Sequence, residues 1–140
     1  ARINGAELQA QKAWTVGGGV SLDALVNYTF LDHRDETDNR PLDILPKHNF
    51  NFEAGVSALS GLRLGLSGLL ASKSWLFDTG SSSLLTIPSF FSLDAVLSYH
   101  LRSFEPFVRM TNIFNHYFYT EPGFPWRGRY LEVGLKTGLL

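Results

Sequence analysis

Hydrophobic and polar residues alternate along most of this chain with a period of two. The clearest run covers residues 20–31, where every second position from Val20 to Phe30 is apolar. A period of two places successive side chains on opposite faces of a β-strand. Similar alternation recurs at 48–58, 62–75, 89–101 and 131–139, and less regularly at 3–13 and 104–119. The sequence therefore predicts an all-β fold of about seven strands, most with one apolar face.

The connections between these strands alternate between short and long. Short turns are expected at 16–19, 60–61 and 102–103, and long polar or Pro-containing stretches at 32–47, 78–88 and 120–128. This order predicts an antiparallel up-and-down meander with tight turns at one end and long loops at the other. Outer-membrane β-barrels have this asymmetry, with short periplasmic turns and longer extracellular loops.

Strand length and charge favour a barrel that spans a membrane. A tilted strand needs about 9–11 residues to cross a bilayer, and four of the runs reach that length. Charged residues make up 18% of the chain, against roughly 25% in soluble domains. An Arg or Lys on the lipid face near the midplane costs about 2–4 kcal/mol. We therefore expect the charges opposite the apolar face to point into the lumen: Asp23, Glu53, Arg63, Asp94, Arg109, Glu132 and Lys136.

Aromatic residues cluster near the long-loop ends of the predicted strands. Such a band is typical of the girdle that a transmembrane barrel places at the membrane–water interface. The girdle predicted from the sequence contains Tyr28, Phe30, Trp75, Phe77, Phe91, Tyr117, Tyr119 and Tyr130.

Composition and motif spacing argue against several other classes of function. Twelve Lys and Arg balance thirteen Asp and Glu, so nucleic acid is not an expected partner. No apolar run approaches the roughly 20 residues of a membrane-spanning helix. There is no Cys, no nucleophile elbow and no pair of His at metal-ligand spacing. We expect neither an enzyme nor a bound metal or cofactor.

Two predicted loops carry candidate contacts for a small ligand. The charged loop that follows residue 31 holds Arg34 and Arg40 and lacks the spacing of an EF-hand. The last loop holds Trp126 and Arg127, which suit stacking on, or pairing with, an anionic ligand at the barrel mouth. Anchoring of the last loop at the membrane surface is the alternative interpretation.

The C-terminal quarter contains a recognisable pattern. A strand ends in Asn112-Ile113-Phe114-Asn115, Tyr117 follows, and after a loop Gly128 and Arg129 lead into the last predicted strand. This arrangement resembles the closing strands of TonB-dependent receptors. Earlier segments resemble that family too, including 27–30 and 87–90. The ending differs, because such barrels usually finish with an aromatic residue and this chain finishes with Leu139 and Leu140.

The resemblance implies a place for the chain and a set of partners. Residues 1–140 would form the C-terminal segment of a transmembrane β-barrel in the bacterial outer membrane, with the plug domain and earlier strands absent. The partners would be membrane lipid, the other strands and plug, a TonB-type energising protein acting through the plug, and a small ligand such as a metal chelate. The transported ligand would be of the siderophore-iron or cobalamin class.

Two alternatives remain open from the sequence alone. One is a small outer-membrane barrel or pore that oligomerisation completes, since seven strands are fewer than the eight of the smallest single-chain barrels. The other is a soluble, lipocalin-like ligand-binding barrel. A soluble barrel buries its apolar face, whereas a membrane barrel turns that face outward, so the orientation of the apolar face separates these classes.

Overall fold

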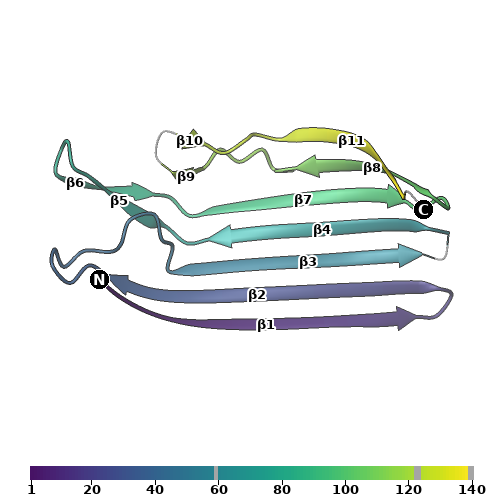
Figure 1. Cartoon of the computed structure of the whole chain (residues 1–140), viewed down its shortest axis with the longest axis horizontal. Helices are drawn as coiled ribbons and strands as arrows, with labels where there is room; N and C mark the ends of the chain where they lie inside the picture. Colours follow the sequence, from purple (N-terminus) through teal and green to yellow (C-terminus); the bar gives the residue numbers. More distant parts are fainter. Residues whose placement is uncertain (59, 122–123, 139–140) are drawn as a thin grey trace.

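The computed structural model describes residues 1–58, 60–121 and 124–138. Seven of its eleven strands form one antiparallel sheet in the order β1-β2-β3-β4-β7-β8-β11 (Figure 1). These strands are β1 (Arg2–Val16), β2 (Val20–Arg34), β3 (His48–Ala58), β4 (Leu62–Ala71), β7 (Phe90–Tyr99), β8 (Phe104–Thr111) and β11 (Tyr130–Thr137). The predicted meander of about seven strands is confirmed. Among the described residues there is no helix long and apolar enough to cross a membrane.

The four other strands form two small hairpins at the end of the sheet that carries the long connections. They are β5 (Ser74–Asp78) with β6 (Ser83–Ile87), and β9 (Tyr119–Glu121) with β10 (Phe124–Pro125). The long connection expected over 78–88 is present, and the structure adds that residues 83–87 form the second strand of the first hairpin. Leu76 pairs with Leu85 across the first hairpin, and the Asp78 carboxylate closes its turn by accepting the Gly80 and Ser81 amides at 3.1 and 3.3 Å.

The main strands end where local conformation stops the pairing. The predicted strand at 48–58 matches β3, whereas β4 ends at Ala71 and β8 at Thr111, earlier than expected. Strand β8 stops because Asn112 has a φ of 50°, in the left-handed region that cannot continue an extended strand. Strand β11 ends at Thr137, so Gly138 does not continue it as expected, and Leu139 lies outside the described residues.

One face of the sheet is apolar from edge to edge. A single row of paired residues crosses all seven strands and contains only large apolar side chains: Trp14, Leu22, Val56, Leu64, Leu97, Val108 and Val133. Most of this row is more than a third exposed, and Val133 reaches 72%. Ala71, Ile87 and Phe118 are the buried hydrophobic residues of the described chain. The sheet therefore has no central hydrophobic core, and its apolar face is left uncovered.

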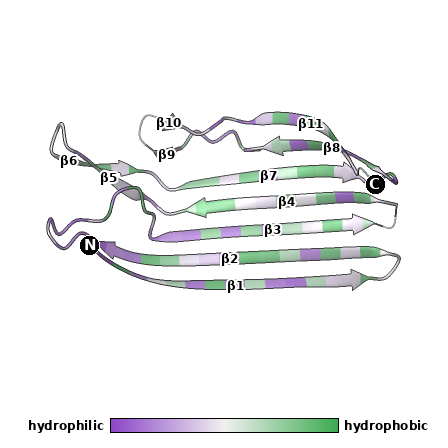
Figure 2. Cartoon of the chain, viewed as in Figure 1, coloured by the Kyte–Doolittle hydropathy of each residue, from purple (hydrophilic) through white to green (hydrophobic). Residues whose placement is uncertain are grey.

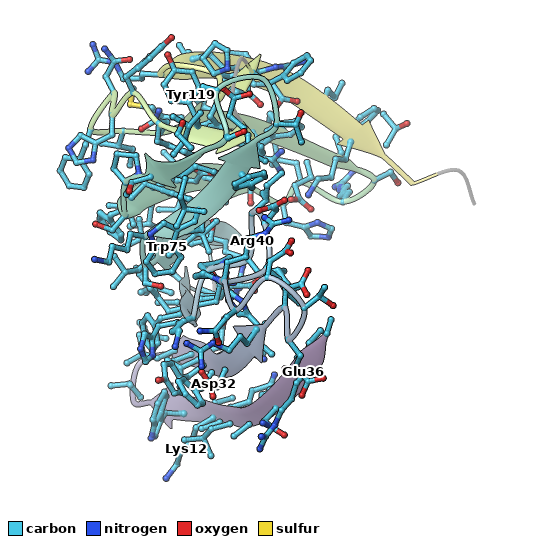
Figure 3. All side chains as sticks on the ribbon, turned by 90° about the vertical axis from the view of Figure 1, so that its left-hand side faces the viewer. Lys12, Asp32, Glu36, Arg40, Trp75 and Tyr119 are labelled. Carbon is cyan, nitrogen blue, oxygen red and sulfur yellow. The ribbon has the colours of Figure 1, made fainter. Side chains whose placement is uncertain are left out.

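The opposite face is polar and lies on the hollow side of the sheet. The neighbouring row contains Ala13, Asp23, Gly55, Gly65, Val96, Arg109 and Glu132. Seen from the loop end, the strands form an arc, and Lys12, which shares the apolar face, points away from the hollow side (Figure 3). Hydrophobic and hydrophilic bands alternate along the strands in Figure 2, as this two-sided arrangement requires.

All seven charged residues that were expected to face the lumen lie on this concave polar face. A groove of about 560 Å³ runs along it, lined by Asp23, Glu53, Arg63, Asp94 and Arg109. A membrane barrel has this arrangement, with apolar residues on its outer face and charged residues on its inner face. The lipocalin-like alternative requires the reverse and is therefore wrong.

Candidate functional site

An ion pair that passes over strand β3 is central to the concave face. The Arg63 guanidinium on β4 donates to both carboxylate oxygens of Asp23 on β2, at 2.8 and 3.0 Å, and to the Ser57 hydroxyl at 2.8 Å. Gly55 lies beneath this pair, and a Cβ atom there would come within 2.6 Å of the carboxylate. Glycine at position 55 therefore allows a two-pronged contact between strands that are not adjacent.

Most other charges on this face pair with a neighbouring strand. Lys136 contacts Glu105 at 2.9 Å, and Arg109 lies 3.5 Å from Glu132. The Glu7 carboxylate accepts a hydrogen bond from the Asn27 side chain at 2.7 Å. These contacts form a polar lining, which suits a surface that meets water, a polar chain segment or a polar solute.

The asparagines of the sequence motif join the end of β8 to the start of β11. The buried Asn112 side chain accepts the His116 amide and donates to the main-chain oxygens of His116 and Arg127, at 2.9–3.2 Å. The Asn115 side chain accepts the Arg129 amide at 2.9 Å. Both asparagines have positive φ, of 50° and 53°, which asparagine tolerates better than most residues. The motif therefore acts here as a structural clamp.

The last loop folds back over the concave face through stacked aromatic rings. The Phe118 ring contacts two other rings. It stacks on Phe90 with centroids 4.1 Å apart and on Trp126 with centroids 5.9 Å apart. The Trp126 amide also donates to the Phe118 carbonyl oxygen. Trp126 lines the polar groove beside Tyr130. One of the predicted ligand contacts thus lies at the loop end of the concave face.

The loop between β2 and β3 is fastened to the β5–β6 hairpin. The Arg40 guanidinium lies 4.4 Å from the Phe77 ring centroid and contacts the Asp43 carboxylate at 3.0 Å. That carboxylate also accepts the Phe77 amide, and the Ile44 amide donates to the Trp75 carbonyl oxygen at 2.7 Å. Ile44 has a φ of 64°, which is strained for a β-branched residue. We call these contacts the loop clasp.

Hydrogen bonds also order two carboxylates at the loop end of the sheet. The Thr37 amide lowers the pKa of Asp35, since it donates to the charged form at 2.9 Å. Hydrogen bonds from the Ser81 hydroxyl and the Gly80 amide lower the pKa of Asp78 in the hairpin turn. Both loops therefore contain turns that favour the ionised acid.

The other predicted ligand contacts are spread over the loop end. Arg34 is exposed at the end of β2 and pairs in register with Arg2, and Arg127 is exposed next to Trp126. Arg40 is held in the loop clasp. Trp126 and Arg127 are neighbours in the sequence. Among the described residues, neither of them contacts Arg34 or Arg40.

The predicted girdle residues fall into three groups. Tyr28, Phe30 and Phe91 lie on the apolar face, as a girdle requires. Trp75 and Phe77 lie on β5, and Tyr117 and Tyr119 contact each other edge to face. Tyr130 departs from the prediction: it pairs with Thr111 on the polar face and lines the groove. Its side chain faces inward because Tyr130 lies two positions before Glu132 and so shares the polar face of β11.

Sequence reasoning missed His33, which is 3% exposed. Its Nδ1 atom accepts the Leu42 amide at 3.1 Å, while its Nε2 atom is buried with no partner among the described residues. A single histidine near a strand end gives no sequence signal for this role. Within the described chain there is no group of three or more His, Cys, Asp or Glu that could hold a metal ion.

Long antiparallel strands with an apolar outer face and a paired polar inner face define the wall of a transmembrane β-barrel. The profile of the family described as "TonB dependent receptor-like, beta-barrel" matches residues 1–115. The chain therefore belongs to this family of non-enzymatic transporters of the bacterial outer membrane. No curated protein matches the sequence.

Solved receptors show the same fold at low sequence identity. FpvA of Pseudomonas aeruginosa, bound to a heterologous pyoverdine, matches with a TM-score of 0.69 and 15% identity, over 96% of this chain and 19% of that one. The FrpB iron transporter of Neisseria meningitidis matches with a TM-score of 0.65 and 16% identity, over 96% of this chain and 23% of that one. The chain thus spans about a fifth of the length of these receptors.

Proposed function

We propose that residues 1–140 form the C-terminal segment of a receptor that carries a scarce ligand across the outer membrane. The observation that carries this proposal is the sheet itself, with its uncovered apolar face outside and its row of paired charges inside. Strands β1 and β11 lie at opposite edges and do not pair with each other. Further strands of the same receptor would cover those edges, since an unpaired edge is an aggregation hazard.

The ligand we propose is a metal chelate of the siderophore-iron class, with cobalamin as the second member of the same functional class. One similar structure is a ferripyoverdine receptor bound to ferripyoverdine, and another is an iron transporter. A large, polar chelate suits a lumen lined with paired charges and hydrogen-bonding groups better than an apolar ligand would.

Trp126 and Arg127 are the ligand contacts that we favour. Trp126 lines the groove, and its ring is already held against Phe118. A fixed aromatic surface loses little conformational entropy when a ligand stacks on it. Arg34 is a further exposed cation at the loop end, whereas Arg40 would have to leave Phe77 and Asp43 before it contacted a ligand.

The partners in this proposal are the plug domain, which would occupy the concave side, and a TonB-type protein that would act on the plug. A plug would meet a polar lining there, whose charged and amide side chains are already paired with one another. The wall supplies the enclosure and the loops, and the energised movement belongs to the plug.

Uptake by whole cells tests this proposal. Cells that lack other receptors of this kind would express the full-length receptor and be given radiolabelled ferric siderophores or cobalamin. We expect TonB-dependent uptake of one of them, and about a tenfold loss of affinity in a Trp126→Ala variant if stacking contributes about 1.4 kcal/mol. Trp14→Ala, at the other end of the wall on the outer face, is the matched control. Absence of uptake for every ligand of both classes would refute the proposal.

A further inference from the structure

A cleft of about 720 Å³ opens at the loop end of the wall, and the proposed transport uses only Phe118 of its lining, the ring that holds Trp126. It lies between the β5–β6 hairpin, the loop ends of β4 and β7, and the segment 116–119. Its lining includes Leu70, Leu85, Ile87, Phe91, Tyr117 and Tyr119. We call it the rim cleft. Its volume is typical of pockets that hold small molecules.

The lower part of the rim cleft continues the outer apolar face. Leu70 and Phe91 pair with each other and lie in the same row as Tyr28 and Phe50. Phe91 also contacts Phe114, which is 54% exposed, with ring centroids 5.9 Å apart. Apolar side chains at this level would meet the acyl chains of the outer leaflet rather than the lumen.

The upper part of the rim cleft carries polar groups. His116 approaches the Phe91 carbonyl oxygen through Nδ1 at 3.2 Å. The Tyr119 hydroxyl donates to the Tyr117 hydroxyl at 3.0 Å. The rim cleft is apolar on the membrane side and polar on the extracellular side.

A cation lies beside the rim cleft. The Lys73 ammonium is 5.5 Å from the centroid of Trp75, and Trp75 pairs across the hairpin with Thr86, which lines the cleft. Lys47 and Lys136 each contact a carboxylate at 2.9 Å, whereas Lys73 makes no ion pair among the described residues. Its charge is therefore available to an anion that enters from the membrane surface.

We propose that the rim cleft binds a lipid of the outer leaflet that carries a net negative charge from phosphates on its sugar headgroup, as lipid A does, with an acyl chain between Leu70, Leu85 and Phe91 and a phosphate beside Lys73. The order of groups along the cleft matches that of a lipid in its leaflet, with the apolar chain at membrane depth and the anion above it. A transported chelate approaches from the lumen, whereas Leu70 and Phe91 face outward. The proposal therefore stands apart from the identity of the transported ligand.

Photocrosslinking in the full-length receptor tests the proposal. A photoreactive phenylalanine analogue replaces Thr86 in the rim cleft or, as a control on the same apolar face, Phe50. The receptor is placed in phosphatidylethanolamine vesicles that contain lipid A with its phosphates, lipid A without them, or no lipid A. We expect phosphorylated lipid A to be captured preferentially at Thr86 and without preference at Phe50.

Two substitutions identify the parts of the site. Lys73→Gln should lower capture at Thr86 by up to about fivefold, the range for an exposed charge contact of about 1 kcal/mol. Lys12→Gln is the matched control, because Lys12 lies 5.6 Å from the Trp14 ring on the same outer face at the other end of the wall. Leu70→Trp should fill the cleft and lower capture of any acyl chain, and heat-shifted migration on gels checks that each variant is folded.

Three results would overturn the proposal. These are equal capture with and without the phosphates, equal effects of Lys73→Gln and Lys12→Gln, and capture at Thr86 of the transported chelate in place of lipid. Capture of phosphatidylethanolamine alone would also overturn it, since a general lipid contact needs no cation at position 73.

Discussion

Replacing Gly55 with alanine should weaken the wall by breaking the contact that passes over it. The new Cβ atom would lie 2.6 Å from both carboxylate oxygens of Asp23 and still closer to the Arg63 guanidinium. Neither partner can keep its position, so the ion pair must separate or the strand must shift. The backbone itself is no obstacle, since Gly55 is not among the residues with positive φ.

The expected cost follows from two contributions. The side chains of Arg63 and Asp23 are 46% and 41% exposed, and an exposed pair of this kind is worth at most about 1 kcal/mol. Forcing an extra methyl group into a closely packed place costs about 1–3 kcal/mol. We expect a total of about 2 kcal/mol in the free energy of unfolding, measured by urea titration of the full-length receptor in lipid vesicles.

A matched control and a double variant make this prediction specific. Gly17→Ala should change stability by less than about 0.5 kcal/mol, because nothing lies within 4 Å of a Cβ atom at that position. In an Arg63→Ala background, Gly55→Ala should cost at least about 1 kcal/mol less than it does alone, since Asp23 can then move aside. Additive effects, or a Gly55→Ala variant as stable as Gly17→Ala, would refute the reasoning.

Three further predictions concern the loops. Asn112→Ala should lower stability by about 3 kcal/mol, since main-chain groups lose buried partners; an unchanged heat-shift temperature on gels would contradict this. Arg40→Ala should increase cleavage after Glu36 by a glutamyl protease up to about fivefold, because the loop clasp loses about 1 kcal/mol; cleavage at the wild-type rate would count against the clasp. Because its pKa lies below the ordinary value of 3.8, Asp78 should hold its turn above that pH and release it on further acidification, moving the Gly80 amide resonance; a constant resonance would exclude this.

The alternation of residues was sufficient to predict the wall. In a strand with one apolar face, the side chains alternate between the two faces at every residue. The boundaries of β3 and the inward direction of Asp23, Arg63 and Arg109 could therefore be predicted from the pattern alone. Tyr130 shows the limit of this reasoning. An aromatic residue at the first position of a strand matches the residue type and depth of a girdle. The pairing of Tyr130 with Thr111 nevertheless places its side chain on the inward face.

The loops could be predicted much less well, because their contacts join residues far apart in sequence. The motif at 112–115 was recognised by resemblance, but its function as a clamp depends on two left-handed asparagines and on the distant Arg127 carbonyl oxygen. The β5–β6 hairpin was missed because its strands have only five residues each and lack a clear period of two. Nor did the sequence indicate that the Asp23–Arg63 ion pair passes over Gly55, since the alternation shows only which face position 55 belongs to.

The orientation of the two faces can be measured directly by spin labelling along β3. This chain has no cysteine, so single cysteines at positions 49–54 and 56 can carry a nitroxide in a full-length receptor from which any other cysteine has been removed, placed in lipid vesicles. We predict high accessibility to oxygen at Phe50, Phe52, Ala54 and Val56, and high accessibility to a water-soluble nickel chelate at Asn51 and Glu53. High oxygen accessibility at Asn51 and Glu53, with the apolar positions shielded from lipid, would contradict the account.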